Sequence, residues 1–264
     1  MGNRSSGLGG ALPNAMVVDA PASAPVVPLL PPKTHCTVCV LRGLCMPAGL
    51  DRDAVERLDA AIHLRLRVKR KDTLYRPGDR FTALYAIRLG TFKTVALAED
   101  GLEQITGYHL PGDVIGADGF GDERHTSQAV ALEDSEVCVL PFFELDRLSA
   151  TVPALRHNLY RLVSRDLCRD HTMMMLLGSR PAEGRLTLFL LDLAERYRAR
   201  GYSGHEFVLR MTREEIASFL GLKLETVSRL FSQFQREGLI EVNQKHVHIL
   251  DIAGLERVLA ASVK

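Results

Sequence analysis

Three cysteines stand close together near the start of the chain, in the segment Cys36-Thr-Val-Cys39-Val-Leu-Arg-Gly-Leu-Cys45. Thiolates at such short spacings are typical ligands of zinc and of iron–sulfur clusters, and both usually take four ligands. A fourth thiolate would have to come from Cys138 or Cys168, the two remaining cysteines. The spacing alone leaves zinc, an iron–sulfur cluster and a thiol–disulfide switch open. Cys168 is expected to be a small buried thiol in a helix.

A second group of functional side chains lies on a predicted helix over residues 224–236. Four polar residues repeat there at helical spacing, opposite a row of apolar ones: Glu225, Ser228, Arg229 and Ser232. Arginine can bond guanine, glutamate accepts from the cytosine amino group, and serine can serve either base. A solvated helix face is the alternative, but a carboxylate aimed at a polyanion is best explained by base reading. The face therefore predicts sequence-specific DNA binding.

The segments around this helix indicate how it is held. Thr212-Arg-Glu-Glu215 has the pattern of a capping box and predicts a helix start. Gly221 supplies a turn before the second helix, and residues 239–249 alternate as a hairpin turning at 243–245. Helix, glycine turn, helix and hairpin together predict a winged helix-turn-helix.

The middle of the chain has a different rhythm, with short β-prone runs between glycine, proline and aspartate turns. The predicted runs are Thr73–Arg76, Phe81–Leu89, Thr91–Leu97, Gln104–Leu110, Ser127–Leu132 and Glu136–Leu140. Many short strands with regular turns predict an all-β barrel or sandwich, and Cys138 falls within the last run.

A long helix is predicted from Pro153 to about Gly178. One stripe of this helix repeats at spacings of three and four, in the order Leu159, Val163, Leu167, Asp170 and Met174. An ordinary core helix is the alternative, but a carboxylate inside an apolar stripe is costly in a core. At a seam between two copies it would face its symmetry mate and weaken the dimer.

Composition sets the remaining limits. The chain has 264 residues, 46% hydrophobic and 25% charged, with a net charge of +1. This is the balance of a soluble globular protein, and the net charge gives no argument for nucleic-acid binding. No run approaches the roughly 20 apolar residues that cross a membrane. Repeated prolines break the first 33 residues, so we expect a disordered tail at 1–33, no export signal and a cytoplasmic protein.

These segments together resemble the fumarate-and-nitrate-reduction regulator (Fnr) family of the cyclic-AMP receptor protein superfamily. The resemblance covers about residues 35–250 and several motifs in order: His35-Cys36-x-x-Cys39, Leu44-Cys45, Leu84-Tyr-Ala-Ile-Arg88, Gln104-Ile-Thr-Gly-Tyr-His-Leu110, Val137-Cys138, Met211-Thr-Arg213 and Gly221-Leu-x-x-Glu-Thr-Val-Ser-Arg-Leu230. It implies an α+β fold in three parts: a cluster-binding segment with a jelly-roll β-barrel like that of cyclic-nucleotide-binding domains at 34–152, a dimerisation helix at 153–179 and a winged helix-turn-helix at 180–264.

The resemblance also implies a function and its residues. A [4Fe–4S] cluster would be held by Cys36, Cys39, Cys45 and Cys138, with Cys168 not a ligand. Base reading by Glu225, Ser228 and Arg229 is implied on inverted repeats like TTGAT…ATCAA, bound by a homodimer, with RNA polymerase as a further partner. Asp170 is implied to oppose dimerisation when the cluster is absent. We therefore expect an oxygen-sensing transcriptional activator, not an enzyme; no nucleophile–base constellation is found in the sequence.

Two departures from related patterns bear on these expectations. Lys223 stands at the N-cap of the second helix, where family members often have threonine, and loss of that cap costs roughly 1 kcal/mol. The cyclic-nucleotide-binding relatives have a Gly-Glu-Leu turn and an Arg-Ser pair on the phosphate. Here the positions read Gly116-Ala117-Asp118 and Thr126-Ser127, which leaves a buried phosphate without a charge partner. No cyclic nucleotide is expected.

Overall fold

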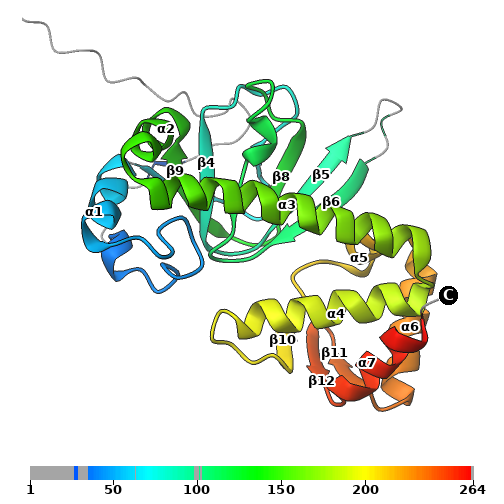
Figure 1. Ribbon diagram of the computed structural model, residues 1–264. Helices are drawn as coiled ribbons and strands as arrows, with labels where there is room; N and C mark the ends of the chain where they lie inside the picture. The colour runs from blue at the N-terminus through cyan, green and yellow to red at the C-terminus, as the bar shows by residue number, and fades with distance from the viewer. Residues whose placement is uncertain (1–26, 29–34, 63, 98–100, 102, 263–264) are drawn as a thin grey trace, which may run out of the picture.

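The computed structural model describes residues 27–28, 35–62, 64–97, 101 and 103–262 (Figure 1). The predicted disordered tail at 1–33 lies outside the described residues except for Val27–Pro28. These two residues form strand β1, which pairs with β2 and was not predicted. No helix in the described part of the chain is long and apolar enough to span a membrane.

Two antiparallel sheets form the first domain, and their strand orders are β1-β2-β9-β4-β7 and β3-β8-β5-β6. The strands are β2 (Leu64–Val68), β3 (Thr73–Tyr75), β4 (Ala83–Leu89), β5 (Phe92–Leu97), β6 (Glu103–His109), β7 (Val114–Ile115), β8 (Ser127–Ala131) and β9 (Ser135–Pro141). Buried side chains from both sheets share one core, so the arrangement is jelly-roll-like. The predicted barrel is not closed, since the two sheets keep separate edges.

One of these edges is covered by the C-terminal domain. Strand β6 lies against α5 (Arg213–Leu220), where the Gln104 side chain donates to the carbonyl of Ser218. Lys93 on β5 also pairs with Glu215 of α5, at 2.8 Å between Nζ and Oε1. These contacts protect the unpaired backbone groups of the edge strand and join the two domains.

Three helices flank the sheets: α1 (Arg52–Ala61), α2 (Phe142–Thr151) and α3 (Pro153–Ser179). Asp51 caps α1 by accepting from the Ala54 amide, and Pro153 starts α3, where its missing N–H costs nothing. Helix α3 extends from the cysteine region past both sheets to the C-terminal domain (Figure 1). The long helix α3 was predicted from the sequence, whereas α2, β2 and β7 were not.

The C-terminal domain confirms the predicted winged helix-turn-helix. Its elements are α4 (Ala182–Arg198), β10 (Glu206–Val208), α5, α6 (Leu224–Arg236), β11 (Ile240–Asn243), β12 (His246–Ile249) and α7 (Ile252–Ala261). Thr212 and Glu215 form the expected capping box. Gly221 has φ +60°, the left-handed conformation that glycine adopts without strain, and it turns the chain into α6. Strand β10 and helix α7 were not predicted from the sequence.

Candidate metal centre and nucleic-acid interface

Four cysteines line one cavity beside the first sheet: Cys36, Cys39, Cys45 and Cys138. Three of them come from residues 35–50, which we call the cysteine loop, and the fourth comes from β9. The rest of the lining is mainly apolar, with Ile62, Ala86 and Leu140 among its members. The structure thus brings the four predicted ligands together.

Strand alternation places Cys138 on the side of the sheet that faces the loop. Val137 and Val139 point into the core between the two sheets, whereas Leu140 packs in the cluster of residues beneath α1 and α2. Because successive side chains of a strand point to opposite faces, Cys138 lies on the same face as Leu140. Cys138 packs against that second cluster together with Cys36 and Cys45.

Burial favours the neutral form of three of these thiols. Burial raises the pKa of Cys45 to about 12 and also raises the pKa of Cys36 well above its usual range. Burial raises the pKa of Cys138 as well, although Arg65 opposes that shift. A metal that binds here must therefore displace protons, which makes its binding depend on pH.

The four thiols have the chemistry of an iron–sulfur ligand set. Within the described part of the chain, no three Cys, His, Asp or Glu side chains are placed to hold one metal ion. Four thiols around an apolar cavity do match the ligand set of an iron–sulfur cluster, whose four irons keep the ligands farther apart than one zinc would.

Asp59 on α1 anchors the start of the cysteine loop. Its carboxylate accepts from the Cys36 amide at 2.7 Å and contacts the His35 ring. Burial alone would raise the pKa of Asp59, but the Cys36 amide and His35 outweigh it and hold that pKa below its usual value. Asp59 thus stays ionised and fixes the backbone next to one ligand.

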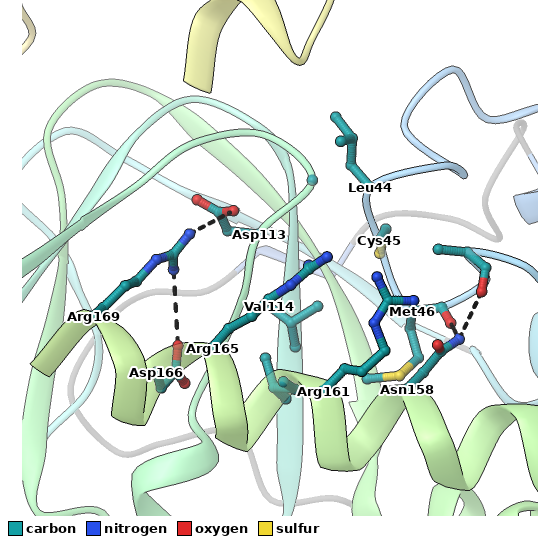
Figure 2. Close-up of a pocket in the computed structure, with 13 residues that line it drawn as sticks. Leu44, Cys45, Met46, Asp113, Val114, Asn158, Arg161, Arg165, Asp166 and Arg169 are labelled. Carbon is teal, nitrogen blue, oxygen red and sulfur yellow. Dashed lines mark hydrogen bonds and ion pairs between the residues drawn. The ribbon is translucent and has the colours of Figure 1, made fainter. Parts of the chain in front are cut away.

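Asn158 connects the cysteine loop to the long helix α3. Its side-chain amide donates to the carbonyls of Met46 and Ala48, at 2.8 and 2.9 Å (Figure 2). Both carbonyls lie within three residues after Cys45 in the loop. Arg161 and Arg165 reach across the same cleft from α3, as Figure 2 shows. A displacement of the loop therefore has a direct hydrogen-bonded path to α3.

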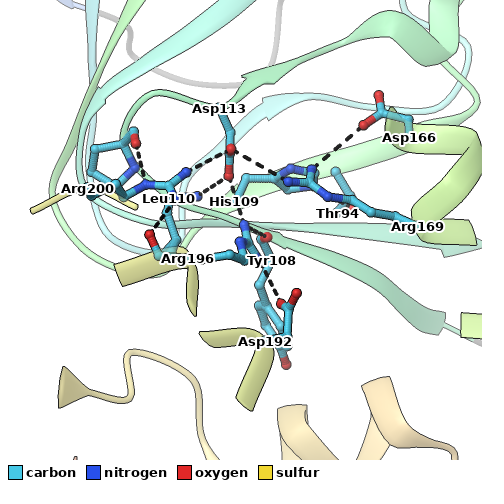
Figure 3. A network of polar contacts seen from close by, with 11 residues as sticks. Thr94, Tyr108, His109, Leu110, Asp113, Asp166, Arg169, Asp192, Arg196 and Arg200 are labelled. Carbon is cyan, nitrogen blue, oxygen red and sulfur yellow. Dashed lines mark hydrogen bonds and ion pairs between the residues drawn. The ribbon is translucent and has the colours of Figure 1, made fainter. Parts of the chain in front are cut away.

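Asp113 joins the two sheets of the first domain to both α3 and the C-terminal domain (Figure 3). Its carboxylate accepts from Arg196 and Arg200 at 2.8 Å each, and Arg169 of α3 lies 3.7 Å away. The neighbouring Gly112 is packed so closely on Leu44 that an added Cβ would lie 3.0 Å from the Leu44 Cβ. The turn that carries Asp113 thus also contacts the cysteine loop.

Replacing Asp113 with asparagine should destabilise the protein, because two buried guanidiniums lose their carboxylate. Burial alone would raise the pKa of Asp113, but Arg196 and Arg200 hold it well below its usual range. A depressed pKa stabilises the fold above the ordinary aspartate pKa of about 4, and this is lost as pH falls. Urea unfolding of the cluster-free D113N should show a loss of about 3 kcal/mol at neutral pH, shrinking in acid.

Asp192→Asn is the matched control for this measurement. Asp192 also pairs with Arg196, but at 3.5 Å and with 59% of its side chain exposed. Exposed pairs contribute about 0–1 kcal/mol, so this variant should unfold nearly like the parent. Equal losses in the two variants would contradict a special role for Asp113.

The predicted stripe of α3 is open to solvent over most of its length. Of the 27 residues of this helix, only Leu155 and Leu176 are buried. Val163 is 44% exposed, Leu167 54% and Met174 70%, while Leu159 is half-buried and Asp170 exposed. An apolar stripe of this size is typical of a surface that a partner covers. The prediction of a buried thiol at Cys168 is wrong, because that residue lies on the uncovered side of α3 and is exposed.

Helix α6 presents the predicted reading face. Glu225, Ser228 and Arg229 are exposed, while the alternate row of Val227, Leu230, Phe231 and Phe234 is buried. Lys223 at the N-cap makes no side-chain capping bond, as the missing threonine predicts. The first turn of α6 is thereby left with free amides at the surface, where a phosphate could accept from them.

Asp118 lies in the region where this sequence differs from the pattern of the cyclic-nucleotide-binding relatives. Its carboxylate accepts from the amides of Thr126 and Ser127 at 3.0 and 2.9 Å, and from the Ser127 hydroxyl at 2.8 Å. It also lies 3.0 Å from the ring of His125. An internal carboxylate therefore already uses these donors.

Comparison with known proteins places both domains. Residues 184–258 match the Crp-like helix-turn-helix domain, and residues 65–151 match the cyclic nucleotide-binding domain. The chain is 49% identical to the transcriptional regulatory protein btr of Bordetella pertussis, over 88% of this chain and 96% of that one. It is 42% identical to the anaerobic regulatory protein of Haemophilus influenzae, over 84% and 86%.

A solved structure shows the same architecture. FixK2 from Bradyrhizobium japonicum aligns with a TM-score of 0.68 and 26% identity, over 74% of this chain and 96% of that one. The relatives are transcriptional regulators rather than enzymes. The chain belongs to the Crp/Fnr family, whose members regulate transcription, bind DNA and act as dimers.

Proposed function

We propose that this regulator senses oxygen through a [4Fe–4S] cluster on Cys36, Cys39, Cys45 and Cys138. The observation that carries the proposal is the single apolar cavity that all four thiols line. When bound, the cluster supplies a link between loop and strand that oxygen can destroy. The Haemophilus relative, named an anaerobic regulatory protein, is consistent with this role.

The chain's own contacts account for how the sensor reaches the dimer. Loop closure over a long stretch of chain is entropically costly, so the cysteine loop needs a bond to stay in place. With the loop in place, Asn158 holds Met46 and Ala48 and fixes the start of α3. We propose that this offsets the repulsion between two Asp170 carboxylates and allows the helices to pair. With the loop released, the repulsion dominates and the protein is a monomer.

Zinc or a thiol–disulfide switch on the same cysteines is the second candidate. It keeps the DNA-binding regulator and changes only the sensor. A cyclic nucleotide is not proposed, because Asp118 takes the donors of Thr126 and Ser127 that would face its phosphate.

Anaerobic purification tests the proposal directly. We expect about four irons and four sulfides per chain, a brown protein and a dimer in size-exclusion chromatography. Exposure to air should bleach the colour and convert the dimer to a monomer. Colourless protein that contains zinc would select the second candidate. Protein free of both iron and zinc that still dimerises and binds palindromic DNA would refute both forms of metal control.

Asn158→Leu should separate cluster binding from dimerisation. Leucine has a similar volume but cannot donate to the Met46 and Ala48 carbonyls, so the loop loses its hold on α3. We expect unchanged iron per chain and a dimer dissociation constant raised about tenfold, the effect of roughly 1.5 kcal/mol from two lost hydrogen bonds. Sedimentation under argon measures it. Loss of iron in this variant would instead mean that Asn158 supports the cavity itself.

On DNA we propose that Glu225, Ser228 and Arg229 read bases of an inverted repeat resembling TTGAT…ATCAA. Two α6 helices of a dimer would enter successive major grooves about one helical turn apart. We further propose that the bound dimer, in the cytoplasm, contacts RNA polymerase.

Arg229→Ala should weaken binding to the cognate site by about 1–3 kcal/mol and relax preference at one base pair. The reason is the loss of a bidentate contact to guanine. Binding to a set of sites with single substitutions, measured at fixed salt, reports this pattern. A uniform loss on every sequence would show that Arg229 contacts phosphate instead.

A further inference from the structure

A buried arginine lies directly against Cys138. Arg65 on β2 is the register partner of Cys138 on β9, and only 8% of Arg65 is exposed. Side chains of directly opposed residues in an antiparallel pair share one face of the sheet. The charge of the Arg65 guanidinium, together with hydrogen bonding from it, acts to lower the pKa of the Cys138 thiol against the effect of burial.

Arg65 belongs to a three-membered charge cluster. Glu136 lies on the same face of β9, with Oε1 3.6 Å from Nη1 of Arg65 and 2.7 Å from Nη1 of Arg88. Arg88 also lines the cavity of the four thiols. Both guanidiniums bring positive charge near the Cys138 sulfur. Negative charge close by stabilises a buried cation.

Four thiolates on a [4Fe–4S]²⁺ core would supply that negative charge, −2 in total. The reduction potential of such a cluster depends on hydrogen bonds to its sulfurs and on nearby charge. If a bound cluster lost one electron to dioxygen, which would become superoxide, its charge would change from −2 to −1. A fixed cation beside it stabilises the more negative state and so opposes this step.

We propose that Arg65 is a positioning residue of the sensor: it orients the Cys138 sulfur and slows the oxidation of the bound cluster by its charge. The inference rests on the proposed function and assigns the sensitivity to oxygen to a specific side chain. Arg65 contacts the ligand and not the iron, so its effect is on the potential and lifetime of the cluster. The alternative is a purely structural role, in which Arg65 only pairs with Glu136 and does not affect the cluster.

Arg65→Met and Arg65→Lys are the test variants, and Arg67→Met is the matched control. Arg67 stands two residues along the same strand but is exposed. After anaerobic reconstitution we would measure iron per chain, the midpoint potential and the decay of visible absorbance in air. In the methionine variant the midpoint should shift negative and decay should quicken about tenfold, as for a lost hydrogen bond to a charged group. The lysine variant should fall between, and R67M should match the parent.

Folding is controlled separately. In the single variant Arg65→Met, Glu136 loses one of its two arginine neighbours. The double variant Arg65→Met with Glu136→Gln removes that carboxylate as well. Circular dichroism of the cluster-free chains reports the stability of both variants. If R65M folds, binds as much iron as the parent and has the same midpoint potential and cluster lifetime in air, the inference is overturned. The proposed function would remain intact. A parent protein that binds no iron would instead overturn the proposed function.

Discussion

Cys138→Ser should abolish the iron–sulfur absorption of anaerobically purified protein, whereas Cys168→Ser should leave it unchanged. Cys138 is the proposed ligand that would join the sheet to the cysteine loop, and it lines the same cavity as the other three thiols. A serine hydroxyl is a far poorer ligand for iron than a thiolate. Cys168 lies exposed on α3, outside that cavity. Iron and sulfide per chain and the visible spectrum measure both variants.

The same pair of variants should also differ in assembly. With three ligands left on the loop, nothing would tie the loop to β9, and the anaerobic C138S protein should elute as a monomer. C168S should remain a dimer that dissociates in air. If C168S loses its iron and C138S keeps it, the fourth ligand has been assigned to the wrong cysteine. If both keep four irons, the cluster is bound elsewhere.

The proximity of Cys36 and Cys39 and the exposed polar face of α6 could be predicted because local spacing determines them. Glu225, Ser228 and Arg229 are exposed because Val227 and Leu230 of the same helix must be buried, and a period of 3.6 residues separates the two rows. The short spacing of Cys36 and Cys39 likewise needs no tertiary contact to bring two thiols together.

Arg65, Asp113 and Asn158 could not be predicted for the opposite reason. Leu64–Val68 alternates between leucine and arginine, which would assign Arg65 to the solvent face, yet Arg65 is buried in the finished structure. Asp113 follows Pro111 and Gly112, a pattern that indicates a turn and nothing about the arginines that converge on it. Asn158 acquires its role only where the cysteine loop docks. Each role depends on segments far apart in the chain.

The exposed side of α3 explains why the prediction of a buried Cys168 was wrong. It also explains why we propose that Asp170 affects dimerisation. A single chain leaves Leu167 and Met174 open to solvent, so any residue on that side is exposed until a second copy covers it. Burial of those apolar side chains favours pairing by roughly 25 cal/mol for each Å² of apolar surface removed from water. Asp170 is the charged residue of the stripe, and we propose that it opposes this gain.

Asp170→Ala should therefore give a dimer that binds its palindromic site in air. The change removes two carboxylates that the proposed dimer brings face to face, and alanine also favours the helix. Moving an equilibrium from mainly monomer to mainly dimer requires only a few kcal/mol. Sedimentation of aerobic, iron-free protein and binding to labelled DNA measure the two effects. A variant that stays monomeric and does not bind DNA would show that the Asp170 carboxylate is not what prevents dimerisation.

Asp166→Ala separates a specific effect at Asp170 from a general gain in helix stability. Asp166 lies one turn earlier on the same helix, but it lines the cleft beneath the cysteine loop and lies 3.8 Å from Arg169. Both substitutions remove one negative charge and introduce alanine, so propensity and net charge change equally. Only Asp170 lies on the uncovered stripe, and only its removal should produce an oxygen-independent dimer. If Asp166→Ala dimerises in air as well, the charge of α3 as a whole controls pairing, and the geometry of the stripe does not.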